Sequence, residues 1–347
     1  MWRFLIPTFL LLVFGLFNLA GIKPYLLQSQ VIYAVVALGV FLLIKKIGIV
    51  FFRINTPVWY AIFFILLLLT LFVGEDINGS RRWINLFFFN FQPSEFFKVF
   101  AILIISDFLA KNQRILKEFP VFLAIVASFT IPAILIFLQP DLETAVMISA
   151  IFLTIALFSE VPKKYIITLI VIAVLMIPLA WPFLADYQKN RVLSFIDPSV
   201  DPTGTSYNMT QSIITVGSGQ LTGRGLGLGK QSTLFFLPEN HTDFAFASLV
   251  EQFGFIGGLT VITLYLLFAL VLIRTIVMNM GKKGEHNRFQ YFFATGFFVY
   301  FIFQVFINIG MNLGLLPVSG TALPLISYGG SSLVTWMIGL AFLTEQS

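Results

Sequence analysis

The stretch LPENHTDFAFASLVEQFGFIGG, residues 237–258, places an acidic residue directly before a long hydrophobic segment. Asp243 is followed by mostly apolar residues as far as about residue 273, and a long polar stretch precedes it. A hydrophobic segment of roughly 20 residues or more can cross a membrane as a helix. Asp243 is therefore predicted to lie at or just below a membrane surface, where an ionisable group is costly and is expected to be functional.

The composition of the whole chain indicates a polytopic membrane protein. Of the 347 residues, 58% are hydrophobic and 11% are charged, against roughly 25% charged residues in an average soluble domain. The apolar runs are continuous and do not alternate, which argues against a transmembrane β-barrel. The sequence contains no cysteine, so disulfides, metal thiolates and cysteine nucleophiles are excluded. The net charge of +5 comes from basic residues scattered between apolar runs, so we expect no nucleic-acid partner.

Hydropathy predicts an all-α fold of about ten transmembrane helices in a single domain, residues 1–347. The predicted segments run approximately over residues 4–20, 27–44, 57–74, 94–110, 119–138, 142–159, 164–185, 243–273, 289–313 and 324–344. With the N-terminus inside, the inner segments hold thirteen basic residues: Arg3, Lys45, Lys46, Arg53, Lys111, Arg114, Lys117, Lys163, Lys164, Arg274, Lys282, Lys283 and Arg288. The short outer loops hold only Lys23, Arg81 and Arg82. The positive-inside rule therefore predicts that both termini are cytoplasmic, and inner acids such as Asp107 and Glu285 are expected to balance basic loops.

The outer connection over about residues 186–242 is too long for a plain connector and is predicted to be ordered. Its segment GRGLGLGK, residues 223–230, is rich in glycine and carries Arg224 and Lys230. Backbone N–H groups and two cations of this kind can bind a phosphate, although the spacing is not that of a P-loop. A flexible hinge is the alternative interpretation of these glycines.

Charged residues also meet the membrane near the fourth predicted helix. Pro93 suits the first turn of a helix, which places Glu95 and Lys98 three residues apart on one face. The two either neutralise each other or face a water-filled cavity, in which Lys98 attracts phosphate and Glu95 orients it or holds a cation. Arg82 and Trp83 lie just outside this helix. They are either interfacial anchors or, for Arg82, a ligand of a diphosphate.

Three acids, Glu239, Asp243 and Glu251, gather around one helix start, which is more than capping requires. A carboxylate in an apolar setting can act as a base near neutral pH, and Asp243 is the candidate for that role. His241 fits a helix-cap or interface residue.

Two further polar pairs have open interpretations. Asp141 follows a proline at a tight outer turn, where it is either an N-cap or, with Glu143, a ligand of a hard cation such as Mg²⁺. Asn308 and Asn312 stand four residues apart in a stretch broken by Gly, Pro and Ser. They either face a cavity or belong to a region of close helix packing.

Six sequence blocks, in the same order along the chain, resemble the signature segments of the SEDS family, the RodA, FtsW and SpoVE group. The blocks are RRWINLFFFNFQPSEFFK, LQPDLETA, RVLSFIDPSVDPTGTSYN, GRGLGLG, FLPENHTDFAFA and NIGMNLGLLPVSG with LPLISYGGSSL, which span about residues 79–333. FQPSE and the absence of an N-terminal extension resemble the elongation subgroup, RodA, more than the division subgroup, FtsW.

The resemblance implies a peptidoglycan glycosyltransferase of the cytoplasmic membrane, which polymerises lipid II on the outer face for cell elongation and rod shape. The resemblance places the essential aspartate of the family at Asp243 and the aspartate of its Gln-Pro-Asp motif at Asp141. The conserved Arg-Trp pair of the family corresponds to Arg82 and Trp83, and its membrane-embedded acid and base correspond to Glu95 and Lys98. The chain departs from the family pattern at Glu143, where Gly is usual, and at Gln252, where a second acid is common. The resemblance also implies a class B penicillin-binding protein and other rod-complex proteins as partners.

The implied chemistry is one inverting displacement, from an α-linked undecaprenyl diphosphate donor to a β-1,4 product. It requires a base for the acceptor 4-hydroxyl, assigned to Asp243, and cations for the departing diphosphate. The cationic side chains assigned to this role are Arg82, Lys98, Arg224 and Lys230. No tightly bound cofactor is expected, and a divalent cation, Mg²⁺ or Mn²⁺, near Asp243 or Asp141 is an option. A lipid II flippase and a non-catalytic scaffold for a transpeptidase are the alternatives. The acids crowd the outer boundary instead of spreading across the bilayer, which favours the enzyme.

Overall fold

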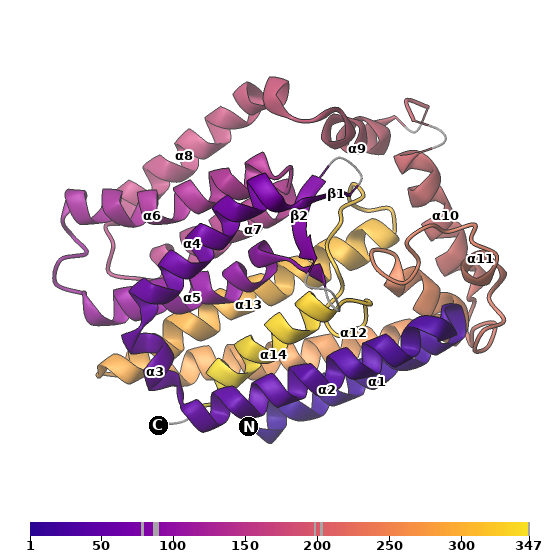
Figure 1. The fold of residues 1–347 in the computed structure, drawn as a ribbon, viewed down its shortest axis with the longest axis horizontal. Helices are drawn as coiled ribbons and strands as arrows, with labels where there is room; N and C mark the ends of the chain where they lie inside the picture. The colour runs from indigo at the N-terminus through magenta and orange to yellow at the C-terminus, as the bar shows by residue number, and fades with distance from the viewer. Residues whose placement is uncertain (78–79, 86–89, 198, 202–203, 346–347) are drawn as a thin grey trace. The chain divides into compact units, whose positions relative to one another are not determined.

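The computed structural model of the chain describes residues 1–77, 80–85, 90–197, 199–201 and 204–345. Within these ranges the chain forms fourteen α-helices, one short 3-10 helix and three short strands (Figure 1). The helices are α1 (Trp2–Ile22), α2 (Pro24–Ile47), α3 (Ile49–Ile54), α4 (Thr56–Val73), α5 (Pro93–Lys111), α6 (Phe119–Leu138), α7 (Leu142–Leu157), α8 (Lys163–Ala180), α9 (Asp186–Ile196), α10 (Thr205–Ser218), α11 (Lys230–Thr233), α12 (Ala245–Asn279), α13 (Glu285–Asn312) and α14 (Gly330–Thr344). The 3-10 helix is η1 (Trp181–Phe183).

Ten of these helices coincide with the ten predicted hydrophobic segments, so the helical fold class and the multi-pass membrane character are confirmed. Of the described helices, seven are long and apolar enough to cross a membrane; the number of spans and their topology stay predictions. The last segment was placed too early. It was predicted to begin at residue 324, but α14 begins at Gly330. Pro324 and Gly329 precede it, and such residues favour irregular backbone over helix.

A small antiparallel sheet between α4 and α5 was not predicted. Its strands are β1 (Glu75–Ile77), β2 (Ser80–Asn85) and β3 (Asn90–Phe91), in the order β1-β2-β3. Trp83 pairs with Glu75 on one side of β2, and Ile84 pairs with Phe91 on the other. Strands of two to six residues are too short for alternation to distinguish them from loop. The sheet places Arg82 and Trp83 on a paired strand.

The sequence predicts one domain, and the contacts divide the chain into two compact units. Unit 1 comprises residues 1–38, 183–270 and 301–334, and unit 2 comprises residues 39–182, 271–300 and 335–347. Helices α2, α12, α13 and α14 each contribute residues to both units.

In unit 2, helices α4, α5, α6 and α7 pack against one another, and α5 is buried along most of its length. Helix α8 packs on α7 and buries only Ile166 along its described length. The apolar side chains that α8 exposes, such as Val174 and Ile177, are those that a lipid environment accepts.

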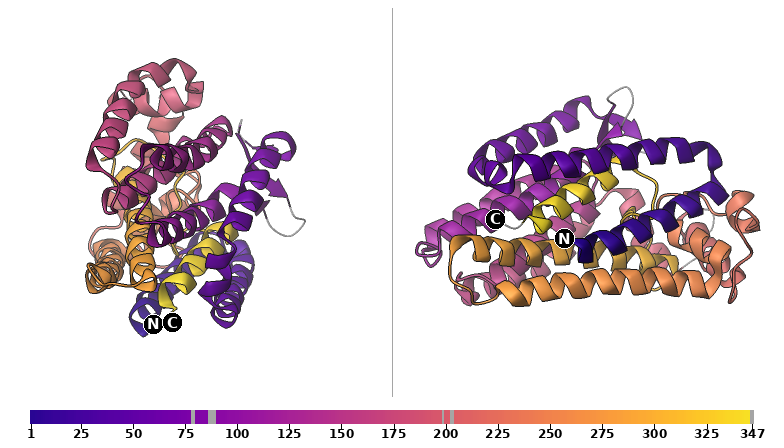
Figure 2. Two further views of the ribbon diagram at one scale, coloured as in Figure 1. Left: turned by 90° about the vertical axis from the view of Figure 1, so that its left-hand side faces the viewer. Right: turned by 90° about the horizontal axis from the view of Figure 1, so that it is seen from below.

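The longest described helix, α12, is drawn in orange in Figure 2. Its part in unit 1 contains a break at Gly254. The backbone there has φ 72° and ψ −170°, which glycine adopts without strain. The N–H groups of Phe255 and Ile256 donate to the carbonyls of Gln220 and Leu221 at 2.8 and 3.2 Å. The break therefore ties the long polar connection to α12, because the freed helical N–H groups bond to that connection.

Candidate functional site

The predicted site residues fall into two groups, one in each unit. Asp243, Arg224 and Lys230 belong to unit 1. Arg82, Trp83, Glu95, Lys98, Asp141 and Glu143 belong to unit 2.

Asp243 lies in the turn before α12, and the backbone of this turn is held by hydrogen bonds from distant parts of unit 1. The Ser327 hydroxyl donates to the Thr242 carbonyl at 2.5 Å, and the Tyr328 N–H donates to the His241 carbonyl at 2.8 Å. Phe244 anchors the turn in an apolar cluster with Leu237, Ala247 and Val318. Asp243 itself is only half-buried, so its carboxylate sits on a fixed backbone at the edge of the packed core.

Glu239 and Glu251, which the sequence places with Asp243 around one helix start, both have structural contacts. Glu239 closes the turn: its carboxylate accepts from the Thr242 hydroxyl at 2.8 Å and its carbonyl accepts from the Phe244 N–H at 3.1 Å. Glu251 is 1% exposed, and its carboxylate accepts from the N–H groups of Gln231 and Ser232, both at 2.9 Å, and from the Ser232 hydroxyl at 2.5 Å. These acids shape the chain around Asp243.

We predict that Glu251→Gln destabilises the protein by about 1.5–3 kcal/mol, because hydrogen bonds to a charged acceptor are lost. The amide would also point its NH2 group at one of the two N–H donors, that of Gln231 or that of Ser232, because these bond to different oxygens of Glu251. The measurement is the thermal unfolding midpoint of detergent-purified protein, with limited proteolysis of the connection before α12. Glu239→Gln, at an exposed acid, is the control and should change the midpoint little. Equal midpoints for the two variants would contradict the prediction.

The glycine-rich segment, residues 223–230, uses its backbone N–H groups within the protein. Arg224 N–H donates to the Glu251 carbonyl at 2.8 Å, and Gly225 N–H donates to the Gln252 carbonyl at 3.0 Å. Gly227 N–H donates to the Gln252 side chain at 3.1 Å. These three N–H groups therefore bond to acceptors within the protein, and phosphate binding by the segment stays a prediction. The side chains of Arg224 and Lys230 are exposed, and their role as phosphate ligands stays a prediction.

His241 packs its ring 5.7 Å from the ring of Tyr328, centroid to centroid. Its Nδ1 atom is buried and has no hydrogen-bond partner among the described residues. Burial lowers the pKa of His241 below its ordinary value, the positive charge of Lys23 lowers it further, and Glu239 partly opposes both. The ring is therefore neutral at pH 7, which suits the interface role that the sequence predicts.

The lowered pKa of His241 predicts a stability that falls with acidity. The unfolded chain takes up this proton near pH 6.5, whereas the folded protein takes it up only at a lower pH. Stability is therefore lost as the pH falls from 7.5 through the folded pKa. In His241→Gln this component is absent, so the drop in unfolding midpoint between pH 7.5 and 5.5 should be smaller than in the wild type. A drop of the same size would contradict the prediction.

In unit 2, Glu95 and Lys98 form the pair that their spacing predicts. Lys98 Nζ lies 2.6 Å from Glu95 Oε1, and it also lies 5.3 Å from the centre of the Tyr300 ring. Lys98 is 1% exposed. The second carboxylate oxygen, Glu95 Oε2, is buried and has no hydrogen-bond partner among the described residues. The pair is thus a buried ion pair with one acceptor unused.

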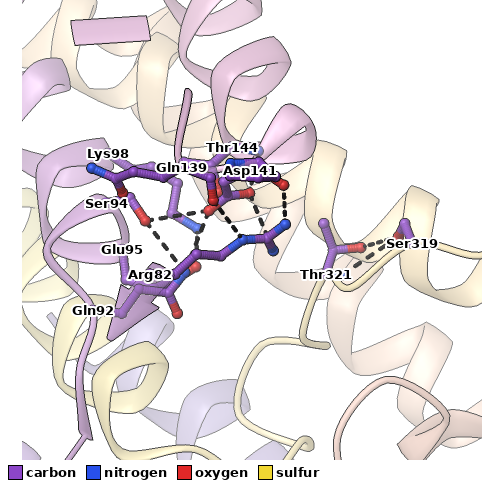
Figure 3. A network of polar contacts seen from close by, with 11 residues as sticks. Arg82, Gln92, Ser94, Glu95, Lys98, Gln139, Asp141, Thr144, Ser319 and Thr321 are labelled. Carbon is purple, nitrogen blue, oxygen red and sulfur yellow. Dashed lines mark hydrogen bonds and ion pairs between the residues drawn. The ribbon is translucent and has the colours of Figure 1, made fainter. Parts of the chain in front are cut away.

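Asp141 is the centre of a polar network that includes Arg82 (Figure 3). It caps α7 by accepting from the Thr144 N–H at 3.3 Å, which confirms the N-cap interpretation. Its other oxygen accepts from Gln92 and Ser94, each at 3.4 Å. Arg82 Nη1 lies 3.8 Å from Asp141, and its other nitrogens donate to the carbonyls of Gln139 and Pro140.

This network joins β2, the start of α5 and the turn before α7. Arg82, Gln92 and Ser94 lie more than 40 residues before Asp141 in the sequence, so only the fold brings them to it. The nearest signal in the sequence was the Gln-Pro-Ser segment before Glu95, which supplies Gln92 and Ser94. Trp83 is half-buried on the same strand as Arg82. Among the residues described, no group of three or more His, Cys, Asp or Glu is placed to hold a metal ion.

A second ionic cluster in unit 2 confirms the predicted pairing of Asp107 and Glu285 with basic residues. Asp107 accepts from Arg53 at 2.7 Å and from Lys111 at 2.6 Å, and Arg53 also bonds to Glu285. Arg53 stacks 4.5 Å from the centre of the Phe289 ring. The cluster joins α3, α5 and α13, and its charges are mutually satisfied.

Comparison with known proteins adds family information to this geometry. The family model for FtsW, RodA and SpoVE, described as cell cycle protein, matches residues 10–347. A probable peptidoglycan glycosyltransferase FtsW of Buchnera aphidicola is 36% identical over 320 residues, which cover 91% of this chain and 82% of the relative. Peptidoglycan glycosyltransferase MrdB of Escherichia coli K12 is 37% identical over 284 residues, covering 82% and 75%. A chain from a solved peptidoglycan synthase complex that coordinates polymerization and crosslinking superposes with a TM-score of 0.80 at 28% identity, covering 99% of this chain and 96% of that one.

Proposed function

The chain belongs to the FtsW, RodA and SpoVE family of cell cycle proteins, and we propose that it is a peptidoglycan glycosyltransferase. The proposed reaction polymerises lipid II into β-1,4 glycan strands with release of undecaprenyl diphosphate, for cell elongation and rod shape. The proposed location is the cytoplasmic membrane, with the site on its outer face. The observation that carries the proposal is the half-buried Asp243 on a backbone held by Ser327 and Tyr328.

The proposed mechanism is a single inverting displacement. The acceptor 4-hydroxyl oxygen attacks the anomeric carbon of the donor, and Asp243 takes the hydroxyl proton as general base. The bond from the anomeric carbon to the diphosphate oxygen breaks, and that oxygen leaves with the electron pair. Cations stabilise the leaving diphosphate; the exposed Arg224 and Lys230 support such a role. For Arg82 and Lys98 the same role is proposed, although both have protein partners in this structure.

A partner is proposed on the same grounds. A relative of known structure is part of a complex that coordinates polymerization and crosslinking. We propose that this chain likewise works with a class B penicillin-binding protein, a transpeptidase, and with other proteins of the rod complex.

The test is polymerisation by the purified chain, alone and with its transpeptidase partner, in liposomes that contain lipid II. The products are separated by size, with Mg²⁺ or Mn²⁺ added in one arm and EDTA in another. Glycan polymer supports the enzyme, and its loss with EDTA supports a divalent cation. Transbilayer movement of lipid II without polymer would favour the flippase, and neither activity in any arm would favour the scaffold.

A further inference from the structure

Two buried asparagines of α13 converge on the main chain of Asp243. Asn308 and Asn312 are both 0% exposed and lie one helical turn apart. Their Nδ2 atoms donate to the Asp243 carbonyl at 2.9 and 3.1 Å. All three residues belong to unit 1. A carbonyl that accepts two side-chain donors has its direction fixed from two sides.

Asn312 replaces a hydrogen bond that a regular helix would make. In an α-helix the N–H of residue 247 would donate to the carbonyl of residue 243. Here the Ala247 N–H donates to Asn312 Oδ1 at 2.9 Å, and Asn312 Nδ2 donates to the Asp243 carbonyl. The side-chain amide therefore stands between the two main-chain groups. The regular helical pattern begins with the next residue, where the Ser248 N–H donates to the Phe244 carbonyl at 3.2 Å.

Asn308 extends the same arrangement to the irregular segment before α14. Its Nδ2 atom also donates to the Thr321 carbonyl at 2.7 Å, and its own carbonyl accepts from Asn312 at 2.8 Å. Because Asn312 must present its oxygen to an N–H group, its nitrogen must face the Asp243 carbonyl. The orientation of the Asn312 amide thus follows from its partners.

We propose that Asn308 and Asn312 are positioning residues for the polymerisation reaction. They hold the Asp243 peptide out of the first turn of α12 and so set the direction in which its carboxylate projects toward the acceptor hydroxyl. The inference rests on the proposed function of Asp243. A general base must be held within about 0.5 Å of its working geometry, and a misplacement of about 1 Å can lower the rate about 100-fold.

The experiment measures kcat and KM for lipid II, per folded enzyme, in Asn308→Ala and Asn312→Ala, with Asn308→Ser, which is uncharged and keeps a hydroxyl donor, in case an alanine variant fails to fold. The positioning role predicts a fall in kcat of about 10- to 100-fold with KM within about twofold of wild type. The matched control is Asn18→Ala. Asn18 is equally buried, at 1% exposed, and donates to the Ala245 carbonyl at 3.1 Å, and its hydrogen-bond partners among the described residues are Ala245 and Gln252. It should lower the unfolding midpoint comparably and leave kcat within about twofold of wild type.

Two results would overturn the inference. One is an unchanged kcat in folded Asn308 and Asn312 variants, and the other is a loss that Asn18→Ala reproduces in full. In both cases the wild type still makes polymer, so the proposed function survives. If the wild-type protein makes no polymer even with its partner, the proposed function is wrong, and this inference is wrong with it.

Discussion

Asp243→Asn is expected to lower the rate of glycan polymerisation by about 100- to 10,000-fold, the range that a general base contributes. The substitution keeps the size of the side chain. It also keeps the carbonyl contacts with Asn308 and Asn312 and the backbone contacts of the neighbouring residues. What it removes is the group that accepts the proton from the acceptor hydroxyl. The measurement is the initial rate of lipid II consumption with purified protein and partner.

The control for this variant is Asp197→Asn, which changes an exposed acid in the same long connection. Asp197 accepts hydrogen bonds from Ser199, so its role is local, and the rate should stay near that of wild type. Unfolding midpoints of both variants should match the wild type within experimental error. An Asp243→Asn protein that is folded and polymerises lipid II at the wild-type rate would remove Asp243 as the base.

Lys98→Met is expected to destabilise the protein by about 3–5 kcal/mol, because it leaves the buried Glu95 carboxylate without its cation. Lys98 Nζ and Glu95 Oε1 are 2.6 Å apart, and the two side chains are 2% and 15% exposed. The double variant Glu95→Gln/Lys98→Met removes both charges and should recover most of this stability. The measurement is the unfolding midpoint of each variant in the same detergent.

The double variant also distinguishes the two interpretations of the pair. If Lys98 binds the diphosphate, the stable double variant should polymerise lipid II at least about tenfold more slowly than wild type, through the loss of a charged donor to the leaving group. If the pair only neutralises charge within the membrane, the rate should recover together with the stability. Lys111→Met is the matched control: it breaks an ion pair in the same helix, with Asp107, at a side chain that is 38% exposed. It should change the rate little.

The sequence predicted the helices well, because lipid requires long, continuous apolar segments and their hydropathy can be read directly. It also predicted contacts that lie within one or two helical turns. The Glu95–Lys98 pair and the Asp141 cap are of this kind, because helical geometry alone brings such residues together. The small sheet around Trp83 was missed, since its strands are too short to carry a pattern.

The long-range contacts could not be predicted, because nothing in the local sequence indicates which distant group will meet a given side chain. Glu251 was one of three acids that the sequence places around one helix start, and only the structure shows that its carboxylate holds the connection before α12. The N–H groups of the glycine-rich segment were candidates for phosphate, but the main chain and the side chain of Gln252 occupy two of them. In both cases a polar group of suitable chemistry was satisfied by a partner inside the protein.

By itself, the sequence determined that this is a helical membrane protein, that it resembles the SEDS family, and that Asp243 is the acid to examine first. Only the tertiary structure decided what holds Asp243 in place. Asn308 and Asn312 follow it by more than 60 residues, and the Asn312 amide replaces a bond that the helix would otherwise make for itself. The physical reason is that apolar content and helical spacing are local properties of a chain, whereas the partner of a buried polar group is chosen by packing.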